Sequence, residues 1–236
     1  MAIQPATHSV PTGLKLGYAV ATPVIGAVYW QRYGPRNFLW VSDLALASTA
    51  LSVITENRLL ASMPAVGVLC LEFAWNADFL TRGRLLGLAG YMFDRRMPLG
   101  LRALSLFHVA LPPTLLWMLR RFGYDPRALP AQTALTWATL SASYILTKPE
   151  ENINWVYGPG RKPQRIVAPL LYLCLEMIAL PVAVFLPMHF LLKRLFPQRQ
   201  TVHRAGTTRE RSGFREYPHT KRSACTRLGG SHDRET

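Results

Sequence analysis

Long apolar runs, separated by short loops that contain arginine and lysine, dominate the first 192 residues of the chain. Each run is long enough to cross the ~30 Å hydrocarbon layer of a bilayer as a helix. Apolar spans joined by basic loops are typical of polytopic membrane proteins. The pattern therefore predicts an all-α bundle of about six transmembrane helices. The predicted spans are residues 14–30, 38–54, 59–80, 99–119, 129–146 and 166–192.

The same pattern divides the chain into three parts. Residues 1–13 form a short N-terminal segment, residues 14–192 the transmembrane domain, and residues 193–236 a basic tail. The tail is rich in arginine, threonine, serine and glycine, so it cannot bury enough apolar surface to fold alone, and we expect it to be disordered. Its abrupt change of composition also suggests a second hypothesis, in which a shifted reading frame has replaced a shorter native end. Peptide mass spectrometry of the native C-terminus distinguishes the two.

Charge and aromatic residues support the membrane assignment. The net charge of +14 should attract anionic lipid headgroups to the basic loops, so membrane lipids are the predicted partners. Most tryptophans lie near predicted span ends, as in an interfacial aromatic belt. These are Trp30, Trp40, Trp75, Trp117 and Trp155. Loop charges are nearly balanced between the two sides, which leaves the membrane orientation open.

Several classes of function are disfavoured. The loop arginines are scattered among apolar spans with no recognition module around them, so nucleic acid is not a predicted partner. The three cysteines form no closely spaced pair, which argues against a disulfide framework or a zinc knuckle. The sequence predicts no cofactor and no metal, and it identifies no protein partner.

Four predicted spans contain an ionisable side chain within their apolar run, namely Asp43, Glu72, His108 and Glu176. Such groups are costly in hydrocarbon, so they face a bundle interior or a wet cavity and by default mark a functional site. The alternative is that they serve only helix association through hydrogen bonds between spans.

His108 has the most informative surroundings. It shares a helical face with Ser105 and Pro112, and Pro112 cannot donate a hydrogen bond to the carbonyl of His108 itself. A helix opened at this point offers both imidazole and a bare carbonyl to one cavity. The alternative is a kinked helix whose histidine is hydrogen-bonded to a neighbouring span. In the third span, Glu72 and Asn76 lie one turn apart on a common face.

Two further polar groups are candidates for the cavity. Gln132, Thr136, Thr139 and Ser143 follow one face of the fifth span, which predicts either close helix packing or a cavity wall. The loop after that span contains Glu150, Glu151, Asn152 and Asn154, whose oxygens either cap the local helix start or bind a divalent cation.

Four segments resemble a family of small bacterial multi-pass membrane-associated proteins of unknown function. They are Tyr33-Gly-Pro-Arg-Asn-Phe-Leu-Trp, Ser42-Asp43, Phe107-His108-Val and Pro149-Glu-Glu-Asn-Ile-Asn-Trp-Val. The resemblance covers about residues 14–192 and implies an integral protein of the bacterial cytoplasmic membrane.

More remotely, Ser42-Asp43 and His108 resemble the YwaF-like and androgen-induced-type intramembrane lipid-ester hydrolases. The resemblance implies that Ser42 is the nucleophile and His108 its general base, the two parts that serine acyl transfer needs. Asp43, Glu72 and Glu176 are then candidates to orient the base. The sequence contains no glycine elbow around Ser42.

The leading hypothesis is thus a membrane protein with a polar cavity that hydrolyses or transfers acyl groups of lipid esters through Ser42 and His108. The first alternative is a proton-coupled transporter or ion-binding membrane protein, in which Glu72, His108 and Glu176 carry protons or a cation. The second is a structural or assembly subunit, in which the buried polar groups only join helices.

Overall fold

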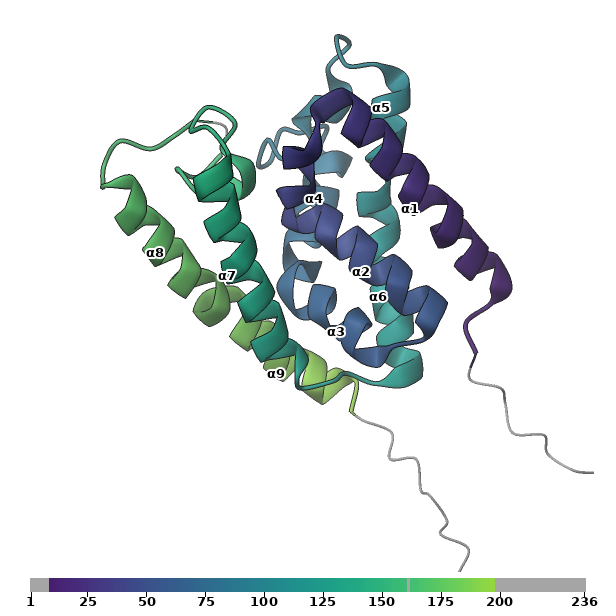
Figure 1. Cartoon of the computed structure of the whole chain (residues 1–236). Helices are drawn as coiled ribbons and strands as arrows, with labels where there is room; N and C mark the ends of the chain where they lie inside the picture. The colour runs from purple at the N-terminus through teal and green to yellow at the C-terminus, as the bar shows by residue number, and fades with distance from the viewer. Residues whose placement is uncertain (1–8, 161, 198–236) are drawn as a thin grey trace, which may run out of the picture. The chain divides into compact units, whose positions relative to one another are not determined.

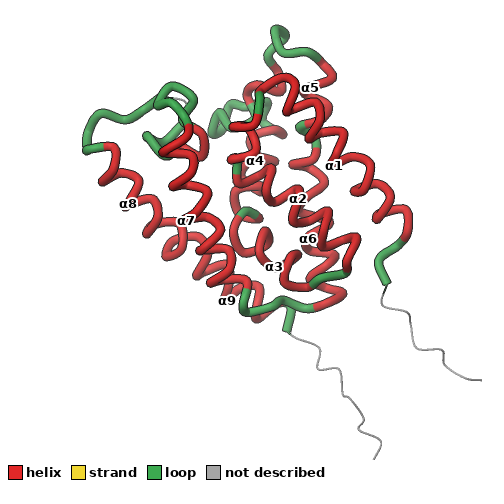
Figure 2. The backbone as a smooth tube through the Cα atoms, in the orientation of Figure 1, coloured by secondary structure: helices red, strands yellow, loops and turns green. Residues whose placement is uncertain are grey.

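The computed structural model describes residues 9–160 and 162–197. Within them the chain forms helices and loops and no strand, as Figure 2 shows, so the all-α prediction is confirmed. The α-helices are α1 (Thr12–Tyr33), α2 (Val41–Thr55), α3 (Arg58–Gly67), α4 (Leu69–Leu80), α5 (Leu99–Leu104), α6 (Phe107–Phe122), α7 (Ala128–Leu146), α8 (Pro169–Ala179) and α9 (Leu186–Leu195).

Shorter helical turns lie between these helices. Three are 3-10 turns, namely η1 (Pro35–Leu39), η2 (Gly90–Phe93) and η3 (Ile153–Trp155). The fourth, η4 (Leu180–Phe185), is a π-helical turn that joins α8 to α9. Helix α9 continues to Leu195, three residues past the predicted end of the transmembrane domain. Residues 198–236 of the predicted basic tail lie outside the described residues.

Every predicted span corresponds to helix, but three of the six are interrupted. The third span breaks at Val68, where α3 and α4 meet at 58°. The fourth breaks at Ser105 and Leu106 between α5 and α6, and the sixth contains the π turn η4. The first, second and fifth spans are the continuous helices α1, α2 and α7 (Figure 1).

Within residues 9–160 and 162–197, fewer helices than the six predicted spans are long and apolar enough to cross a membrane. Leu99–Phe122 and Pro169–Leu195 qualify, with mean hydropathies of 1.4 and 2.1, and the bent pair α3 and α4 becomes a third if it counts as one span. Helix α2 is apolar but has only 15 residues, about 22 Å of helix, against ~30 Å of hydrocarbon. Polar residues along α7 lower its hydropathy. The structure therefore supports two or three membrane-crossing helices by this measure.

Helix α3 packs against α2, α6, α7 and α9. It can do so because the residues it buries are mostly small, among them Ala61, Ser62, Ala65 and Gly67, and small residues let helices approach closely. At Gly67 an added Cβ would lie 2.6 Å from the side chain of Gln132 in α7. Two apolar clusters flank α3, one shared with α1, α2 and α6 and one with α6 and α9.

Three prolines inside helices each free a carbonyl that a neighbouring helix then satisfies. Proline removes the N–H that would bond to the carbonyl four residues earlier. The freed carbonyl of Leu60, four residues before Pro64, accepts a hydrogen bond from the Ser48 hydroxyl at 2.9 Å. That of Met177, before Pro181, accepts one from the Trp137 indole at 2.7 Å. The third, in α6, belongs to the site described next.

Candidate functional site

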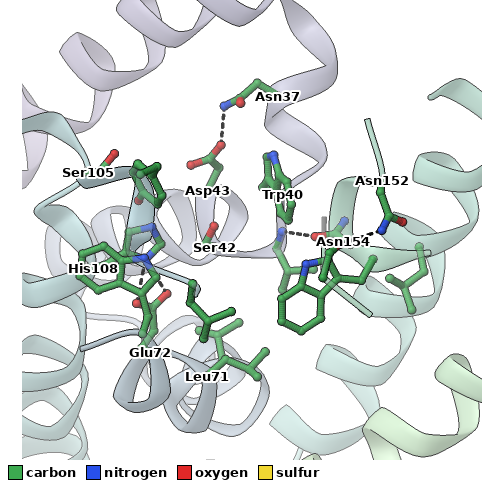
Figure 3. Close-up of a pocket in the computed structure, with 18 of the residues that line it drawn as sticks. Asn37, Trp40, Ser42, Asp43, Leu71, Glu72, Ser105, His108, Asn152 and Asn154 are labelled. Atoms are coloured by element: carbon green, nitrogen blue, oxygen red, sulfur yellow. Dashed lines mark hydrogen bonds and ion pairs between the residues drawn. The ribbon is translucent and has the colours of Figure 1, made fainter. Parts of the chain in front are cut away.

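A cavity of about 930 Å³ lies among the helices. Its wall takes residues from α1, η1, α2, α3, α4, α6, α7, α8 and the loops at 86–88 and 150–160 (Figure 3). Eleven of the side chains selected from the sequence lie on this wall: Ser42, Asp43, Glu72, Ser105, His108, Thr136, Glu150, Glu151, Asn152, Asn154 and Glu176. Asn76, Gln132, Thr139 and Ser143 do not line it.

The central pair of the wall is Glu72 with His108. The Nδ1 atom of His108 lies 2.8 Å and 3.1 Å from the two carboxylate oxygens of Glu72 (Figure 3). Only 4% of the Glu72 side chain and 13% of the His108 side chain are exposed. Among the described residues, no hydrogen bond involves Nε2 of His108. A carboxylate therefore fixes one nitrogen of the imidazole, and the other remains available to a ligand in the cavity.

Aromatic rings hold the His108 imidazole between them. Trp75 stacks on it with ring centroids 4.6 Å apart, and Phe107 lies 4.1 Å away. Trp75, predicted to lie at the membrane interface, is instead 7% exposed and part of the cavity wall. The sequence signal was its position three residues after Glu72, which places both on one helical face.

Asn76 connects α4 to α6 directly behind the pair. Its amide donates to the carbonyl of Glu72 at 2.8 Å and to the carbonyl of His108 at 2.9 Å. The second of these is the carbonyl that Pro112 frees. Asn76 is thus a positioning residue that holds the backbones of Glu72 and His108 at a fixed separation, although it does not itself line the cavity.

The Ser42 and His108 pairing implied by the resemblance is not formed in the structure. Both residues line the cavity, but among the described residues no hydrogen bond joins them. Asp43 does not contact the imidazole either, since its carboxylate accepts a hydrogen bond from the Asn37 amide at 2.8 Å (Figure 3). Ser105 shares a hydrogen bond with the Tyr29 hydroxyl at 3.1 Å.

The polar stripe of α7 serves mainly helix packing. All four residues are buried. Gln132 donates to the Thr136 hydroxyl at 3.1 Å and packs against Gly67, while Thr139 donates to the carbonyl of Leu135. Ser143 accepts a hydrogen bond from the Asn154 amide at 3.0 Å. Thr136 alone of the four lines the cavity.

The polar loop after α7 is held by its own side chains. The Asn154 amide donates to the carbonyl of Leu39 and its oxygen accepts from the N–H of Val41, which joins the loop to the start of α2. Asn152 bonds to Gly158 and Gly160. Glu151 accepts from the N–H of Lys148, which lowers the pKa of the Glu151 carboxyl, and it also pairs with Arg36.

The oxygen of Asn154, the oxygen of Asn152, which accepts from the N–H of Tyr157, and the carboxylate of Glu151 are therefore already bonded within the protein. No group of three or more histidine, cysteine, aspartate or glutamate side chains gathers in a metal-binding arrangement anywhere in residues 9–160 and 162–197. The contacts of Asn154 join this loop to η1 and to the start of α2, and residues of the loop line the cavity.

The three helix interruptions all face the cavity. Gly67 and Val68 line it at the break between α3 and α4, Ser105 and Phe107 at the break between α5 and α6, and Leu180 and Phe185 at the π turn. Non-helical backbone at membrane depth is tolerated where it is buried in protein or lines a water-filled cavity. The three helix interruptions therefore lie together at the wall of one cavity.

One carboxylate that the sequence did not single out holds the cavity's remaining loop. Asp78, at the end of α4, accepts four backbone N–H groups, from Leu85, Leu86, Gly87 and Ala89, at 2.7 to 3.2 Å. Leu86, Gly87 and Leu88 line the cavity. A signal existed in the sequence, since an aspartate precedes a glycine-rich segment that is too short to span.

No family model, no curated protein and no solved structure matches this chain. The family resemblances therefore stay predictions, and the function has to be argued from the cavity itself.

Proposed function

We propose that this is a multi-pass membrane protein that binds a solute in its cavity and couples that binding to proton exchange, as in a proton-coupled transporter. The observation that carries the proposal is the Glu72 and His108 pair. It is buried in the cavity wall, with one imidazole nitrogen bound to the carboxylate and the other without a hydrogen bond to any described residue. Such a pair can accept or release a proton when the occupant of the cavity changes.

The broken helices support this function. Transporters commonly place their binding sites at discontinuous transmembrane helices, because the opened backbone offers polar groups to the solute. Here the interruptions at Val68, at Ser105 and at the π turn all meet the cavity. Helices that are already broken can also change their angle with little loss of backbone hydrogen bonding, as alternating access requires.

We place the whole helix bundle, with its six predicted spans, in the bacterial cytoplasmic membrane. Helices α8 and α9, with the π turn η4 between them, support this placement, because large apolar side chains along this segment are exposed. These include Leu170, Leu171, Leu175, Ile178, Val182, Phe190 and Leu191. An exposed apolar surface of this extent is typical of a lipid-facing helix.

The proposal is tested with the full chain reconstituted in liposomes that contain a pH-sensitive dye. A pH gradient is imposed and a panel of cationic, neutral and anionic solutes is added. We expect at least one solute to discharge the gradient, and we expect Glu72→Gln and His108→Gln to reduce the proton flux to that of protein-free liposomes.

The matched control is Glu56→Gln, because Glu56 lies in the loop between α2 and α3 and pairs with Lys15 away from the cavity. This variant should keep the wild-type flux. Flux that is equal in wild type and in both pair variants would contradict the proposal, as would a panel with no active solute.

A second candidate is the serine hydrolase. The observation in its favour is that Glu72, His108 and Ser42 all line one cavity, with the carboxylate already bound to the imidazole. Acyl transfer must stabilise a developing oxyanion, and the five carboxylates that line the cavity would repel that negative charge. The hydrolase therefore ranks second. A serine-directed fluorophosphonate should label the wild type and not Ser42→Ala if this candidate is correct.

A further inference from the structure

The charge of the cavity wall is opposite to the charge of the protein. The chain has 27 lysine and arginine residues against 13 aspartate and glutamate residues. Among the described residues, the cavity wall nevertheless contains no lysine or arginine. It contains five carboxylates, namely Asp43, Glu72, Glu150, Glu151 and Glu176. A cavity of this composition attracts cations and repels anions.

Among the described residues, one of these carboxylates has a buried oxygen that accepts no hydrogen bond. Glu72 pairs with His108, Asp43 with Asn37 and Glu151 with Arg36. By contrast, the Oε2 atom of Glu176 in α8 is buried and has no hydrogen-bond partner. A buried carboxylate oxygen without a partner is costly. Rotation of the Glu176 carboxylate, which lines the cavity, would turn this oxygen toward a cationic ligand there and remove the cost.

The rest of the wall is suited to an organic cation. Eight aromatic residues line the cavity: Tyr29, Tyr33, Trp40, Trp75, Tyr91, Phe107, Trp155 and Phe185. The faces of aromatic rings attract ammonium groups, and quaternary ammonium ligands are commonly recognised by aromatic cages. The volume of about 930 Å³ is at the upper end of the range for small-molecule sites.

We propose that the ligand of the cavity is an organic ammonium ion with an apolar body, and that Glu176 is its ion-pair partner. This inference rests on the proposed function and specifies its substrate class. The apolar body would contact the aromatic wall, and the cationic nitrogen would lie beside the Glu176 carboxylate.

The test uses two probes that differ only in charge. Benzyltrimethylammonium carries the cation, and neopentylbenzene is its neutral isostere, with carbon in place of nitrogen. Radiolabelled benzyltrimethylammonium is bound to the full chain in lipid nanodiscs, and unlabelled neopentylbenzene and phenylacetate are added as competitors. We expect saturable binding of the cation, competition about tenfold weaker by the neutral isostere, and none by the anion.

Glu176→Gln keeps the shape of the side chain and should weaken binding by about tenfold or more. The control is Asp94→Asn, because Asp94 lies outside this cavity and pairs with Arg96. Its affinity should equal that of the wild type. Trp40→Leu should weaken binding more than Trp40→Phe, which gives a second readout if Glu176→Gln does not fold.

Equal competition by the neutral isostere, or unchanged affinity in Glu176→Gln, would overturn the inference. Its failure is distinguishable from failure of the proposed function. If the cation binds as expected but no solute moves protons, the ligand class stands and proton coupling is wrong. If only neutral or anionic solutes move protons, proton coupling stands and the ammonium ligand is wrong.

Discussion

The cavity has two acidic walls that are built in different ways. On the wall of α4 and α6, Glu72 is almost wholly buried, its carboxylate is bound to His108, and Asn76 fixes the two backbones. On the wall of α8, Glu176 has a buried oxygen without a partner. The first wall is complete without a ligand, whereas the second is not. The comparison separates a carboxylate whose two oxygens both lie within hydrogen-bond distance of a histidine from one that has a buried oxygen with no partner among the described residues.

The largest expected effect follows from leaving the first wall with an unpaired charge. His108→Leu should lower the free energy of unfolding by about 3–5 kcal/mol, because it leaves the Glu72 carboxylate buried without its partner. Adding Glu72→Gln should recover most of the loss. Glu176→Leu, on the second wall, should leave stability unchanged or raise it by about 1–3 kcal/mol, since no partner is lost and a buried oxygen without a partner is removed.

These free energies are measurable by denaturant unfolding of the purified chain in detergent micelles, followed by circular dichroism. If Glu176→Leu destabilised the protein as much as His108→Leu, the distinction between the two walls would be wrong.

A smaller effect is expected when the side chains that donate hydrogen bonds to proline-freed carbonyls are removed, one from each of the two walls. Asn76→Leu removes the donor to the His108 carbonyl and should cost about 1–3 kcal/mol, as for a buried group left unsatisfied. Trp137→Phe removes the donor to the Met177 carbonyl in α8. It should cost about 0.5–1.5 kcal/mol, the ordinary value of one hydrogen bond, because the Trp137 side chain is partly exposed.

Pro112→Ala provides the matched rescue for Asn76→Leu. Alanine restores an N–H that can bond to the His108 carbonyl, so the double variant should be more stable than Asn76→Leu alone. Thermal melting of the four proteins checks both statements, and absence of any rescue would show that Asn76 acts through another contact.

The smallest effect is a pH-dependent change in melting temperature caused by a carboxylate outside the cavity. It shows how the stability contributed by a fully paired acid depends on pH. Asp125, in the loop between α6 and α7, accepts hydrogen bonds from Arg127 and pairs with Arg58. The hydrogen bond from the Arg127 side chain is the main cause that holds the pKa of Asp125 below its ordinary value of 3.8. The hydrogen bond from the backbone N–H of Arg127 and the charge of Arg127 lower this pKa further.

A folded-state pKa below the unfolded one means that the stabilisation is fully present above the unfolded value. It is lost as the pH falls through the folded value. The melting temperature of the wild type should exceed that of Asp125→Asn at pH 6, by the equivalent of about 1 kcal/mol. The difference should shrink below about pH 4. A difference that stays constant down to pH 3 would contradict this assignment.

Local patterns in the sequence predicted the helices well. The fifth apolar run, residues 129–146, differs by one residue from α7, because hydropathy and helix period are properties of neighbouring residues. The freed carbonyl of His108 was also predictable, since it depends only on Pro112. The break at Val68 directly follows Gly67 and lies one turn after Pro64, so the sequence indicates a weak point there but not its angle, whereas no proline or glycine adjoins the break at Ser105.

Pairings between helices were beyond the sequence. Glu72 and Asn76 were expected to share a face, but their common partner, His108, depends on how α4 and α6 are rotated about their axes after the break at Val68. For the same reason, nothing in the sequence showed that Asp43 would bond to Asn37 and leave Ser42 without a contact to the imidazole. Asp78 was overlooked because its partners are backbone N–H groups, and the glycine-rich segment after it indicates a turn but does not show which side chain binds that turn.

The π turn at Leu180–Phe185 fixes the rotational phase of the last helix. Beyond it, His189 of α9 is anchored to the Tyr124 hydroxyl at 2.8 Å, and before it Glu176 of α8 lies on the cavity wall. A regular α-helix advances about 100° per residue. A π turn is wider and advances less per residue, so if the same six residues formed regular α-helix instead, Glu176 would turn about the helix axis while α9 stayed anchored. The single wide turn sets the direction in which this carboxylate points.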